Sequence, residues 1–584
     1  MFLPGSLIPA WAGLTRAFQA PSLRGGDGRV KPGHAGSGHG GWGLRDYPVV
    51  IAGGGPVGMT LALVLARLGT RCLLVERNPA TTRHPKMDIT NARSMEIFRR
   101  LGLAPALRAV AVPEGNPFDV AWITHLGGHE LHRFRYDSVV QWRARIRATN
   151  DGSMPREAPM RVSQVAIEPV LQSAVLAEPL IEARWGVGFE DLSALDAGVE
   201  VVLRRQEDGG TERVRCAYLA GCDGGGSTVR RALDIALEGR AAVMPRFMTH
   251  FRSDARDVLQ RWGTTWHYQS AFATLIAQDD HDTWTLQSRF PPGATPESVD
   301  PAALLRAFCG GISIPHEILV ANHWTPHLLV AERYGAGRVL LAGDAAHQYI
   351  PTGGYGMNTG IGDALDLGWK LAALCGGFGG PGLASSYDAE RRPVGRRNRE
   401  ASARHTDVRM AVGGLYSEAL LASGPAGDAA RAEAGMRIAA LGNAENESWG
   451  IEHGYCYAAS PIVWHEAAAR APDDSVRYEP TTVPGVRLPS IILGDGRFVH
   501  DLLGPWFTLL AVGRAADEGL VTAAARRGVP LALLRLDDPA ADAAYGRGAL
   551  LLVRPDGHIA WRGRGAARDP AIIIARALGW PAHG

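Results

Sequence analysis

GRVLLAGDAAHQYIPTGGYGMNTGIGDALDLGWKLAAL, residues 337–374, decides the fold of this chain. Val339–Ala342 is a short apolar run typical of a buried strand, and it stops at Gly343 and Asp344, where a carboxylate can accept hydrogen bonds from ligand hydroxyls. A glycine-rich loop follows, and from Ala364 apolar residues recur at helical spacing. The stretch predicts a strand, a loop that passes close to a planar ligand, and a helix whose first amides face an electron-rich edge of that ligand.

A second ligand-binding pattern lies far upstream, in YPVVIAGGGPVGMTLALVLARLGTRCLLVE, residues 47–76. Its order is strand, glycine-rich turn, helix and strand, within the length of one βαβ unit. Gly53 supplies the tight turn, Gly55 the close approach to a pyrophosphate, and Gly58 the packing of helix on strand. Glu76 suits a pair of ribose hydroxyls and disfavours a 2′-phosphate. The unit predicts an FAD or NAD site and not an NADP site, the alternative being a turn without a ligand.

A third pattern, CAYLAGCDGGGSTVRRAL, occupies residues 216–233. An apolar strand again ends in an acid and glycines, Asp223 and Gly224, before a helix that Ser227 can cap. Alone it is an ordinary connection between strand and helix, because Asp and Gly are common in such turns. Its position between the other two patterns favours a role in the same site.

Composition limits the class of protein. A chain of 584 residues exceeds what one hydrophobic core supports, and its net charge of +2 at pH 7 favours small molecules over nucleic acid or an anionic membrane as partners. Six cysteines without a CxxC pair or metal-ligand spacing favour a reducing cytoplasm and predict no metal site. No run is long and apolar enough to span a bilayer. Residues 1–45, rich in glycine and without periodicity, are predicted to be a disordered leader.

Taken in order, GGGPVG, CDGGGSTVR and GDAAHQYIPTGGYGMN resemble the three motifs of class A flavoprotein aromatic hydroxylases, the superfamily of p-hydroxybenzoate hydroxylase and phenol hydroxylase. The resemblance extends from about Tyr47 to about Arg399. It implies an α/β fold with an α+β substrate region. The expected parts are a Rossmann-like FAD-binding domain (46–240 and 335–440), an inserted β-sheet substrate domain (241–334), a connection (441–483) and a thioredoxin-like C-terminal domain (484–584). The last part has no CxxC and is assigned a structural or interface role.

The resemblance also implies which residues hold FAD. Glu76 would bind the ADP half, Asp223 would serve both FAD and a transient nicotinamide cofactor, and Asp344 would hold the ribityl chain. Lys86 stands where many relatives have arginine, so a bidentate pyrophosphate contact would become a point-charge contact. Arg93 is either a cofactor contact or a solvated residue at the start of a helix. The full predicted cofactor set is Gly53, Gly55, Pro56, Val57, Gly58, Glu76, Arg77, Lys86, Gln164, Asp223, Gly224, Gly343, Asp344, Pro351, Gly356, Met357 and Asn358.

The chemistry implied by the resemblance comes from the cofactor. NADPH or NADH would deliver hydride to FAD, O₂ would add at flavin C4a, and the hydroperoxide would attack a phenolic or polyketide aromatic ring. No catalytic side chain is assigned, because the protein's task is to position the substrate and exclude water. A small aromatic substrate is the expected partner, and a homodimer stays open as the assembly.

The substrate is expected to contact a sheet between residues 246 and 290, where RFMTHFRS, TTWHYQ, AFATLIAQ and DTWTLQSRF show alternating strand patterns. The resemblance implies that one face of this sheet covers the flavin pocket, which makes His250, Trp266, Tyr268 and Trp284 candidates for lining it. The alternative is that these side chains form core. His347 is predicted to organise the Asp344 turn and not to act as a base.

Two other functions stay open at this point. A non-catalytic carrier on the same fold, like the GDP-dissociation inhibitors, would bind no working flavin, and three intact motifs argue against it. Another flavin enzyme, a halogenase or a dehydrogenase, is the second. The WxWxIP element of halogenases is absent, and product analysis would separate hydroxylation from simple oxidation.

Overall fold

The computed structural model describes residues 46–466, 470–513 and 516–581, so the predicted leader at 1–45 lies outside the described residues. Its central sheet is built on the predicted βαβ unit, β1 (Asp46–Ala52), α1 (Pro56–Arg67) and β2 (Cys72–Glu76). The strand order is β18-β19-β10-β1-β2-β7, with a β8–β9 hairpin paired to β10. The remaining strands are β7 (Ile181–Trp185), β8 (Val187–Leu195), β9 (Gly198–Arg205), β10 (Thr211–Gly221), β18 (Gly335–Ala336) and β19 (Val339–Leu341).

The three glycine motifs meet because their strands are parallel neighbours. β1 pairs with β10 at Ala52 and Gly221, and β10 pairs with β19 at Gly221 and Leu341. The carboxyl ends of these strands therefore lie at one edge of the sheet, where α/β folds bind their ligands. This confirms the predicted Rossmann-like arrangement. Ser227 caps α6 (Thr228–Ala232) as predicted, since its hydroxyl accepts a hydrogen bond from Arg230 N.

The helix after the third motif begins earlier than its apolar spacing indicates. α9 spans Tyr355–Cys375, so Gly356 and Gly360 lie within the helix and not in a loop before it. The reason is close packing against α1. A Cβ on Gly360 would come within 2.5 Å of Val57, and one on Gly368 within 2.5 Å of Val64. The glycines of this motif therefore serve helix contact as well as the ligand site.

A second, antiparallel sheet has the order β16-β12-β15-β14-β13-β4-β5, and all pairs but β13–β4 are antiparallel. The four strands predicted between 246 and 290 are present. The sheet also takes in β4 and β5, from a segment expected in the FAD-binding part, because β4 pairs in parallel with β13. Its strands are β4 (Val120–Ile123), β5 (Glu130–Phe134), β12 (Arg246–Arg252), β13 (His267–Gln269), β14 (Ala273–Ala277), β15 (Thr283–Arg289) and β16 (Glu317–Trp324).

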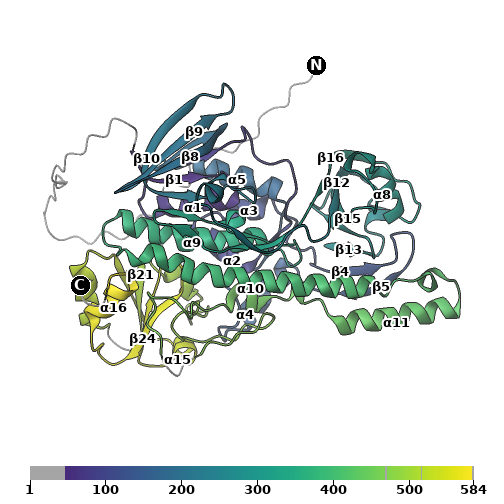
Figure 1. Cartoon of the computed structure of the whole chain (residues 1–584). Coiled ribbons are helices and arrows are strands. Elements are labelled where there is room, and N and C mark those ends of the chain that lie inside the picture. The colour runs from purple at the N-terminus through teal and green to yellow at the C-terminus, as the bar shows by residue number, and fades with distance from the viewer. Residues whose placement is uncertain (1–45, 467–469, 514–515, 582–584) are drawn as a thin grey trace, which may run out of the picture. The chain divides into compact units, whose positions relative to one another are not determined.

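The two faces of this second sheet meet different partners. One face packs on α7 (Arg256–Leu259) and α8 (Pro301–Phe308) through an apolar core. The other face turns toward α10 (Gly382–Gly413) and α11 (Pro425–Leu441), where Trp122 packs against Val412 and Ile438. In Figure 1, α10 runs from the region of α9 toward β5 and α11. The long helix thus links the central sheet to the second sheet.

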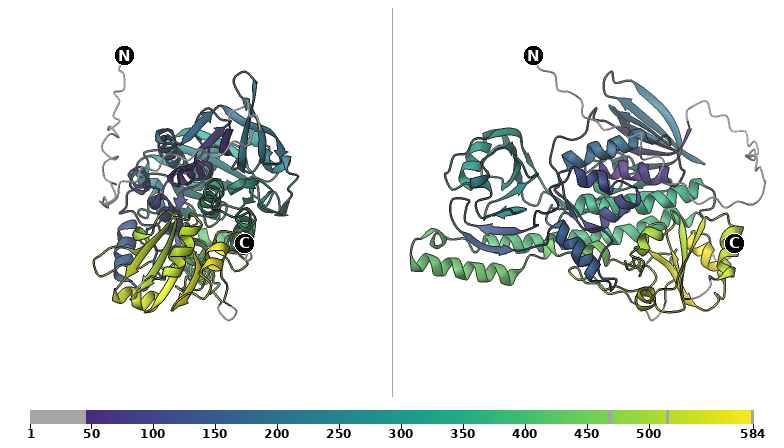
Figure 2. Two further views of the ribbon diagram at one scale, coloured as in Figure 1. Left: turned by 90° about the vertical axis from the view of Figure 1, so that its left-hand side faces the viewer. Right: turned by 180° about the vertical axis from the view of Figure 1, so that it is seen from behind.

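The C-terminal region folds around a four-stranded sheet of order β22-β21-β23-β24, drawn in yellow in Figures 1 and 2. β21 and β22 are parallel, and the other pairs are antiparallel, which agrees with the predicted thioredoxin-like arrangement. Trp369 of α9 lies in the same apolar core as Phe507 of β21. The elements are β21 (Phe507–Val512), α14 (Glu518–Arg526), β22 (Leu531–Leu536), α15 (Pro539–Tyr545), β23 (Ala549–Val553), β24 (Ile559–Arg564) and α16 (Pro570–Ala577).

Shorter elements complete the described chain. Two small sheets, β3-β6 and β11-β17-β20, connect the larger ones. No helix among the described residues has both the length and the apolar character needed to cross a membrane. These elements are β3 (Ile89–Thr90), α2 (Ala92–Arg100), α3 (Ala104–Ala109), α4 (Val139–Ala148), β6 (Met160–Arg161), α5 (Gln164–Ala177), β11 (Leu237–Arg240), β17 (Leu328–Ala331), β20 (His347–Gln348), α12 (Trp449–His453) and α13 (Val499–Leu502).

Candidate active site

A cavity of about 970 Å³, here called the large cavity, lies where the three motifs meet. All of the predicted cofactor residues line it except Gly58, Gly343 and Asn358. The cavity extends from the end of β2 to the start of α9. A long ligand could therefore touch all three motifs at once.

The first motif forms the end of the cavity nearest β2. Glu76 accepts a hydrogen bond from Gly54 N at 2.7 Å and another from Asn78 N at 2.8 Å, so its carboxylate is held at the turn. A Cβ on Gly53 would lie 2.2 Å from Cys222 O, and one on Gly58 would lie 1.9 Å from Gly53 O. These two glycines are required by packing within the protein.

Gly55 differs from its neighbours. A Cβ built on it would meet no protein atom within 4 Å, although the residue lines the large cavity. It precedes α1, whose first turn has no acidic residue and no side-chain cap on its free amides. Free amides at a helix start bind anions. This end of the cavity has room and free amides for a phosphate group that approaches the backbone at Gly55.

The second motif supports the cavity wall from the side. Asp223 caps α6 with its own carboxylate, which accepts hydrogen bonds from Ser227 Oγ, Thr228 N and Val229 N. Gly224 follows with φ +81°, a left-handed conformation that favours glycine. The Asp223 carboxylate, which the sequence pattern assigned to ligand binding, thus also stabilises the turn between β10 and α6.

The third motif forms the opposite end of the cavity. Asp344 borders the cavity with its side chain exposed to it. The protein that surrounds the carboxyl group displaces part of its water and raises its pKa, despite the opposing charges of His347 and Lys86. His347 is fully buried, and its Nε2 lies 2.9 Å from Asp363 Oδ2. The same carboxylate oxygen accepts a hydrogen bond from Gly343 N at 3.1 Å. His347 therefore organises this turn, as predicted, through Asp363.

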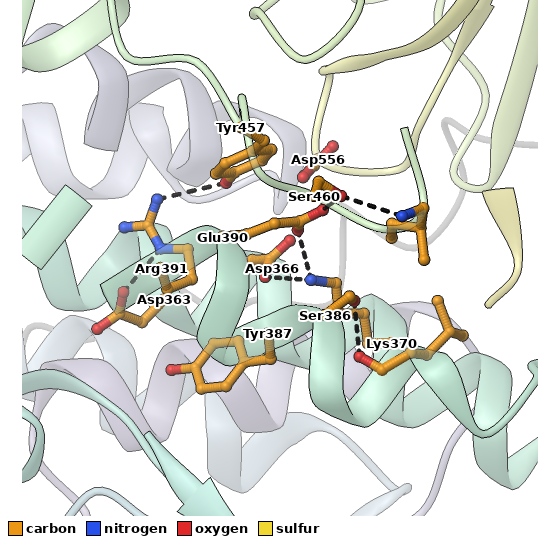
Figure 3. Close-up of polar contacts among 12 residues, drawn as sticks. Asp363, Asp366, Lys370, Ser386, Tyr387, Glu390, Arg391, Tyr457, Ser460 and Asp556 are labelled. Carbon is orange, nitrogen blue, oxygen red and sulfur yellow. Dashed lines mark hydrogen bonds and ion pairs between the residues drawn. The ribbon is translucent and has the colours of Figure 1, made fainter. Parts of the chain in front are cut away.

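Asp363 itself is anchored by a buried cation. Arg391 Nε of α10 donates to Asp363 Oδ1 at 2.8 Å, as Figure 3 shows. Burial alone would raise the pKa of Asp363, but Arg391 and His347 lower it overall. An ionised Asp363 is thus fixed beneath the turn that carries Asp344.

Three predicted residues have less direct roles. Gln164 borders the large cavity while its Nε2 donates to Glu168. Lys86 borders the cavity and is exposed. Asn358 does not reach it: its Nδ2 donates to Ile89 O and Gly354 O, and its Oδ1 accepts from Asn91 N. Asn358 ties the loop before α9 to the start of α2.

Arg93 has neither of the roles expected for it. Its side chain is buried, pairs with Glu96 at 3.2 Å, and donates to Asp556 O in the C-terminal region. Burial alone would lower the pKa of Arg93, but Tyr455, Glu96 and Asp556 raise it. The residue joins α2 to the C-terminal region and does not contact the large cavity.

The site fits FAD. The cavity extends from β2 to α9, and the helices that begin at its two ends, α1 and α9, have no acidic residue in their first turns. Gly55 lines this cavity, and because no protein atom would lie within 4 Å of an added Cβ, a ligand has room to approach its backbone. Glu76 and Asp344, at opposite ends, are suited to ribose and ribityl hydroxyls. The described residues contain no cluster of His, Cys, Asp and Glu that could hold a metal ion.

Comparison with known proteins agrees with this geometry. The family model for an FAD binding domain matches residues 46–402, and the model for the C-terminal part of aromatic-ring hydroxylases matches residues 481–581. The chain belongs to the FAD-dependent aromatic-ring monooxygenases. The first match alone covers more than half of the chain, and the two together include every motif discussed above.

Full-length relatives support the assignment. The FAD-dependent monooxygenase apdD of Emericella nidulans is 36% identical over 92% of this chain and 91% of its own length. The 4-methyl-5-nitrocatechol 5-monooxygenase of a Burkholderia species is 32% identical over 91% of this chain and 97% of its own. The solved structure of the rebeccamycin biosynthetic enzyme RebC with reduced flavin has a TM-score of 0.82 and 33% identity, and covers 92% of this chain and 99% of RebC.

The predicted fold, enzyme class and FAD cofactor of this monooxygenase are thereby confirmed. Its reaction is the monooxygenation of an aromatic compound, which the intact flavin site favours over a non-catalytic carrier.

The four aromatic and histidine candidates on the second sheet of this monooxygenase separate onto two faces. Tyr268 and Trp284 lie in the apolar core against α7 and α8, where Tyr268 Oη donates to Gly263 O and Trp284 Nε1 to Ser253 O. His250 is buried, with its Nδ1 near Trp284 O and Thr285 Oγ1. None of these three residues lines the large cavity or the smaller cavity beside it. Side chains alternate along a strand, and the sequence does not say which face turns toward the flavin.

Trp266 borders a second cavity of about 70 Å³, here called the small cavity. Its Nε1 donates to Asp88 Oδ2 at 2.7 Å, and Asp88 lines the large cavity. Gly353 lines the small cavity while Gly354 lines the large one. The two cavities are therefore neighbours, separated by Trp266 and the loop before α9.

Asp88 lies at this junction, although the sequence patterns did not point to it. Besides Trp266 it contacts His267, whose Nε2 lies 3.1 Å from Asp88 Oδ2. Burial opposes the charged form of Asp88, but His267, Trp266 and Arg161 lower the pKa of its carboxyl overall, while burial lowers that of His267. A carboxylate bonded to an indole and an imidazole thus stands at the junction of the two cavities. The acidic residue in HPKMDIT can be seen in the sequence, but its partners Trp266 and His267 lie about 180 residues further along the chain.

Proposed function

We propose that this enzyme hydroxylates a phenolic or polyketide aromatic with NADPH or NADH and O₂ as co-substrates. The observation that carries the proposal is the junction of a flavin-sized cavity with a small aromatic-walled cavity at Asp88 and Trp266. Bound FAD would supply the redox chemistry. The residues of the chain would bind and orient the ring, exclude water, and offer the Asp88 carboxylate as a hydrogen-bond acceptor.

The aromatic ring is proposed to enter the small cavity with its reacting edge toward the large one. The walls of the small cavity include Phe118, Trp142, Trp266 and Trp449, which suit a flat apolar ring. At about 70 Å³ the cavity is smaller than the ~150 Å³ that accommodates benzene in a protein core, so binding requires its walls to move apart. This size favours one ring of a substrate over a tricyclic system held entirely inside.

Asp88 is proposed to accept a hydrogen bond from a ring hydroxyl, which makes the ring more electron-rich. Replacing it with asparagine keeps an acceptor for Trp266 but removes the charge. Product formation should fall about 10- to 100-fold, the cost of losing one hydrogen bond to a charged acceptor, while FAD content and melting temperature change little. The matched control is Asp280→Asn in the turn between β14 and β15. The Asp280 carboxylate accepts hydrogen bonds from Asn116 and Arg256, and the residue lines neither cavity. Equal rates of product formation in Asp88→Asn and in the native enzyme would contradict this role of Asp88.

The test of the proposed function is oxygen incorporation. The purified protein should be yellow, should oxidise NADPH or NADH faster with a phenol present, and should place one atom of ¹⁸O₂ in the product. Substrate-stimulated NAD(P)H consumption without ¹⁸O in any product would contradict the proposal and favour a dehydrogenase. Both nicotinamides should be compared, because Glu76 excludes a 2′-phosphate only at the first motif.

We also propose a domain division, a cellular location and an assembly for this enzyme. The division into an FAD-binding part (46–240 and 335–440), a substrate part (241–334), a connection and a C-terminal part (484–584) is supported by the three separate sheets, with β4 and β5 added to the substrate part. A cytoplasmic location is supported by six free cysteines. Size-exclusion chromatography with light scattering would test the homodimer.

A further inference from the structure

Two arginines of the second sheet face each other without an ionic partner. Arg246 of β12 stands directly opposite Arg289 of β15, and neither guanidinium forms a hydrogen bond or an ion pair with a described residue. Like charges directly opposite each other on neighbouring strands are destabilising. Arg246 is half-buried and Arg289 is exposed, so water compensates the second cation better than the first. The pair is therefore unfavourable in the protein alone.

Arg409 of α10 adds a third positive charge beside them. Burial and the charges of Arg409 and Arg289 lower the pKa of Arg246 to about 10, and no acidic residue of the described chain is among the groups that shift it. Arg409 itself is compensated, because its Nε donates to both carboxylate oxygens of Glu445, at 3.0 and 2.9 Å. These three arginines, here called the arginine patch, thus leave the charges of Arg246 and Arg289 unbalanced.

The patch lies on the face of the sheet that turns toward α10. Arg289 lies against the end of this helix, where its Nη2 would be 2.9 Å from a Cβ on Gly413. On the same face, Gln269 stands opposite Trp122, which packs against α10 and α11. Gln269 is 1% exposed, yet neither polar atom of its amide has a partner among the described residues. Buried polar groups are rarely left so unless a ligand or water supplies a partner.

The arginine patch neighbours the junction of the two cavities. Glu445, which pairs with Arg409, lines the small cavity. On the other side, burial lowers the pKa of His267, and the charge of Arg409 contributes to the decrease. His267 contacts Asp88, which lines the large cavity. Side chains at the junction thus also face the patch.

We propose that Arg246 and Arg289 bind a carboxylate of the aromatic substrate, so that the enzyme acts on an aromatic acid. The proposal rests on the proposed function, because it takes the anion to be part of the molecule that is hydroxylated. A carboxylate offers two oxygens to a guanidinium in a bidentate pair, and its charge removes the repulsion between the two cations. The ring would lie on the side of Gln269, which shares β13 with His267.

Two pairs of compounds test the proposal on the FAD-loaded full-length enzyme. Each pair joins an acid to its uncharged amide: 3-hydroxybenzoate with 3-hydroxybenzamide, and 6-hydroxy-2-naphthoate with 6-hydroxy-2-naphthamide. Two lengths are used because the patch and the junction lie on different strands. Dissociation constants come from the change in flavin absorbance on titration. In at least one pair the acid should bind at least about 10-fold more tightly than the amide, as expected for one hydrogen-bonded charge pair.

Variants locate the effect at Arg246. Arg246→Gln should weaken the acid of that pair at least about 10-fold and leave its amide within about twofold. Arg246→Lys keeps the charge without the bidentate geometry, so it should recover part of the loss. The melting temperature of ligand-free Arg246→Gln should equal or exceed that of the native enzyme, because no contact is lost and repulsion is relieved. An arginine with a purely structural role would give a lower melting temperature.

Arg252→Gln is the matched control. Arg252 is exposed and stands on the same strand, six residues further on. At the usual rise per residue it lies about 20 Å from Arg246. The substitution removes the same net charge, so it reports the effect of the general electrostatic field. All four dissociation constants should stay within about twofold of the native values.

Failure of this proposal is distinguishable from failure of the proposed function. Equal binding of acid and amide in both pairs, or equal weakening of both by Arg246→Gln, would overturn the proposal while hydroxylation stands. So would a loss of acid binding in Arg252→Gln as large as in Arg246→Gln, or a failure of Arg246→Gln to fold. If no aromatic probe perturbs the flavin or stimulates NAD(P)H oxidation, the proposed function fails and this proposal fails with it.

Discussion

Replacing Gly55 with alanine is expected to leave the enzyme folded and to weaken FAD binding by about 10- to 100-fold. The backbone of Gly55 has φ −73°, which alanine adopts freely, and the added Cβ would meet no protein atom within 4 Å. That space belongs to the large cavity, where we propose that the pyrophosphate of FAD approaches the start of α1. An added methyl group in a close contact costs about 1–3 kcal/mol, and each 1.4 kcal/mol is tenfold in affinity.

The matched variant is Gly58→Ala, three residues further on. Its Cβ would lie 1.9 Å from Gly53 O, inside the protein, so it should lower the melting temperature as well as the FAD content. Flavin absorbance of the purified proteins, flavin fluorescence titration of the apoproteins and thermal unfolding separate the two effects. Native-like FAD affinity in Gly55→Ala would mean that the cofactor phosphates do not approach this turn.

The two glycines illustrate what a sequence pattern can predict. A motif such as GGGPVG reports a backbone conformation that few sequences adopt, so it predicts the turn, the helix and the ligand class together. If one dinucleotide touches all three motifs, the parallel strands that carry them must be neighbours in the sheet. The order of the motifs therefore also predicts the strand pairing. The alternating segments between 246 and 290 likewise predicted their four strands, because the period of two is local information.

Other features could not be predicted because they depend on distant partners. Trp266 and Tyr268 stand two positions apart, a spacing that places two side chains on one face of a continuous strand. However, β13 begins at His267, so Trp266 lies before the strand and borders the small cavity, while Tyr268 lies in the core behind the sheet. Arg93 was expected near solvent or cofactor, and its partner is Asp556, 463 residues along the chain. A charged residue in a single sequence is predicted to be exposed. Only the assembled fold reveals the buried partner.

Replacing Arg554 with leucine should destabilise the enzyme by about 3–5 kcal/mol, because it removes one partner of a buried ionic cluster. Arg554 follows β23 and is fully buried. Its Nη1 and Nη2 donate to the two oxygens of Glu390 at 2.6 and 2.8 Å, and Nη2 also reaches Asp366 at 2.8 Å and Asp556 at 2.6 Å. Asp366 lies on α9 and Glu390 on α10, so one guanidinium joins the C-terminal region to both helices.

Loss of this cation leaves the carboxylates with too little positive charge. Figure 3 shows Glu390 and Asp366 together around Lys370, whose Nζ lies 2.5 Å from Glu390 and 2.7 Å from Asp366. Burial alone would raise the pKa of Glu390, but Arg554 and Lys370 lower it to about 2. Without Arg554 that pKa must rise. Because Asp366 is one turn from Asp363 on α9, the variant should also release FAD at lower denaturant concentrations than the native enzyme.

The same argument gives the pH dependence of the defect. A carboxyl group whose pKa is higher in the folded than in the unfolded state binds a proton on folding, so folding becomes more favourable as pH falls through the folded-state pKa. The deficit of Arg554→Leu should therefore be largest near pH 8 and shrink toward about pH 5. Urea unfolding followed by circular dichroism and flavin fluorescence at several pH values measures it.

Arg562→Leu provides the matched control on the neighbouring strand. Arg562 pairs with Glu466 at 2.6 Å, but the two side chains are 31% and 33% exposed, so water replaces the lost contact. Its loss should cost less than about 1 kcal/mol at any of these pH values. A deficit in Arg554→Leu no larger than in this control, or one that does not shrink as pH falls, would show that the buried carboxylates do not depend on Arg554. The C-terminal region would then be held to α9 mainly by their shared apolar core, which includes the contact of Trp369 with Phe507.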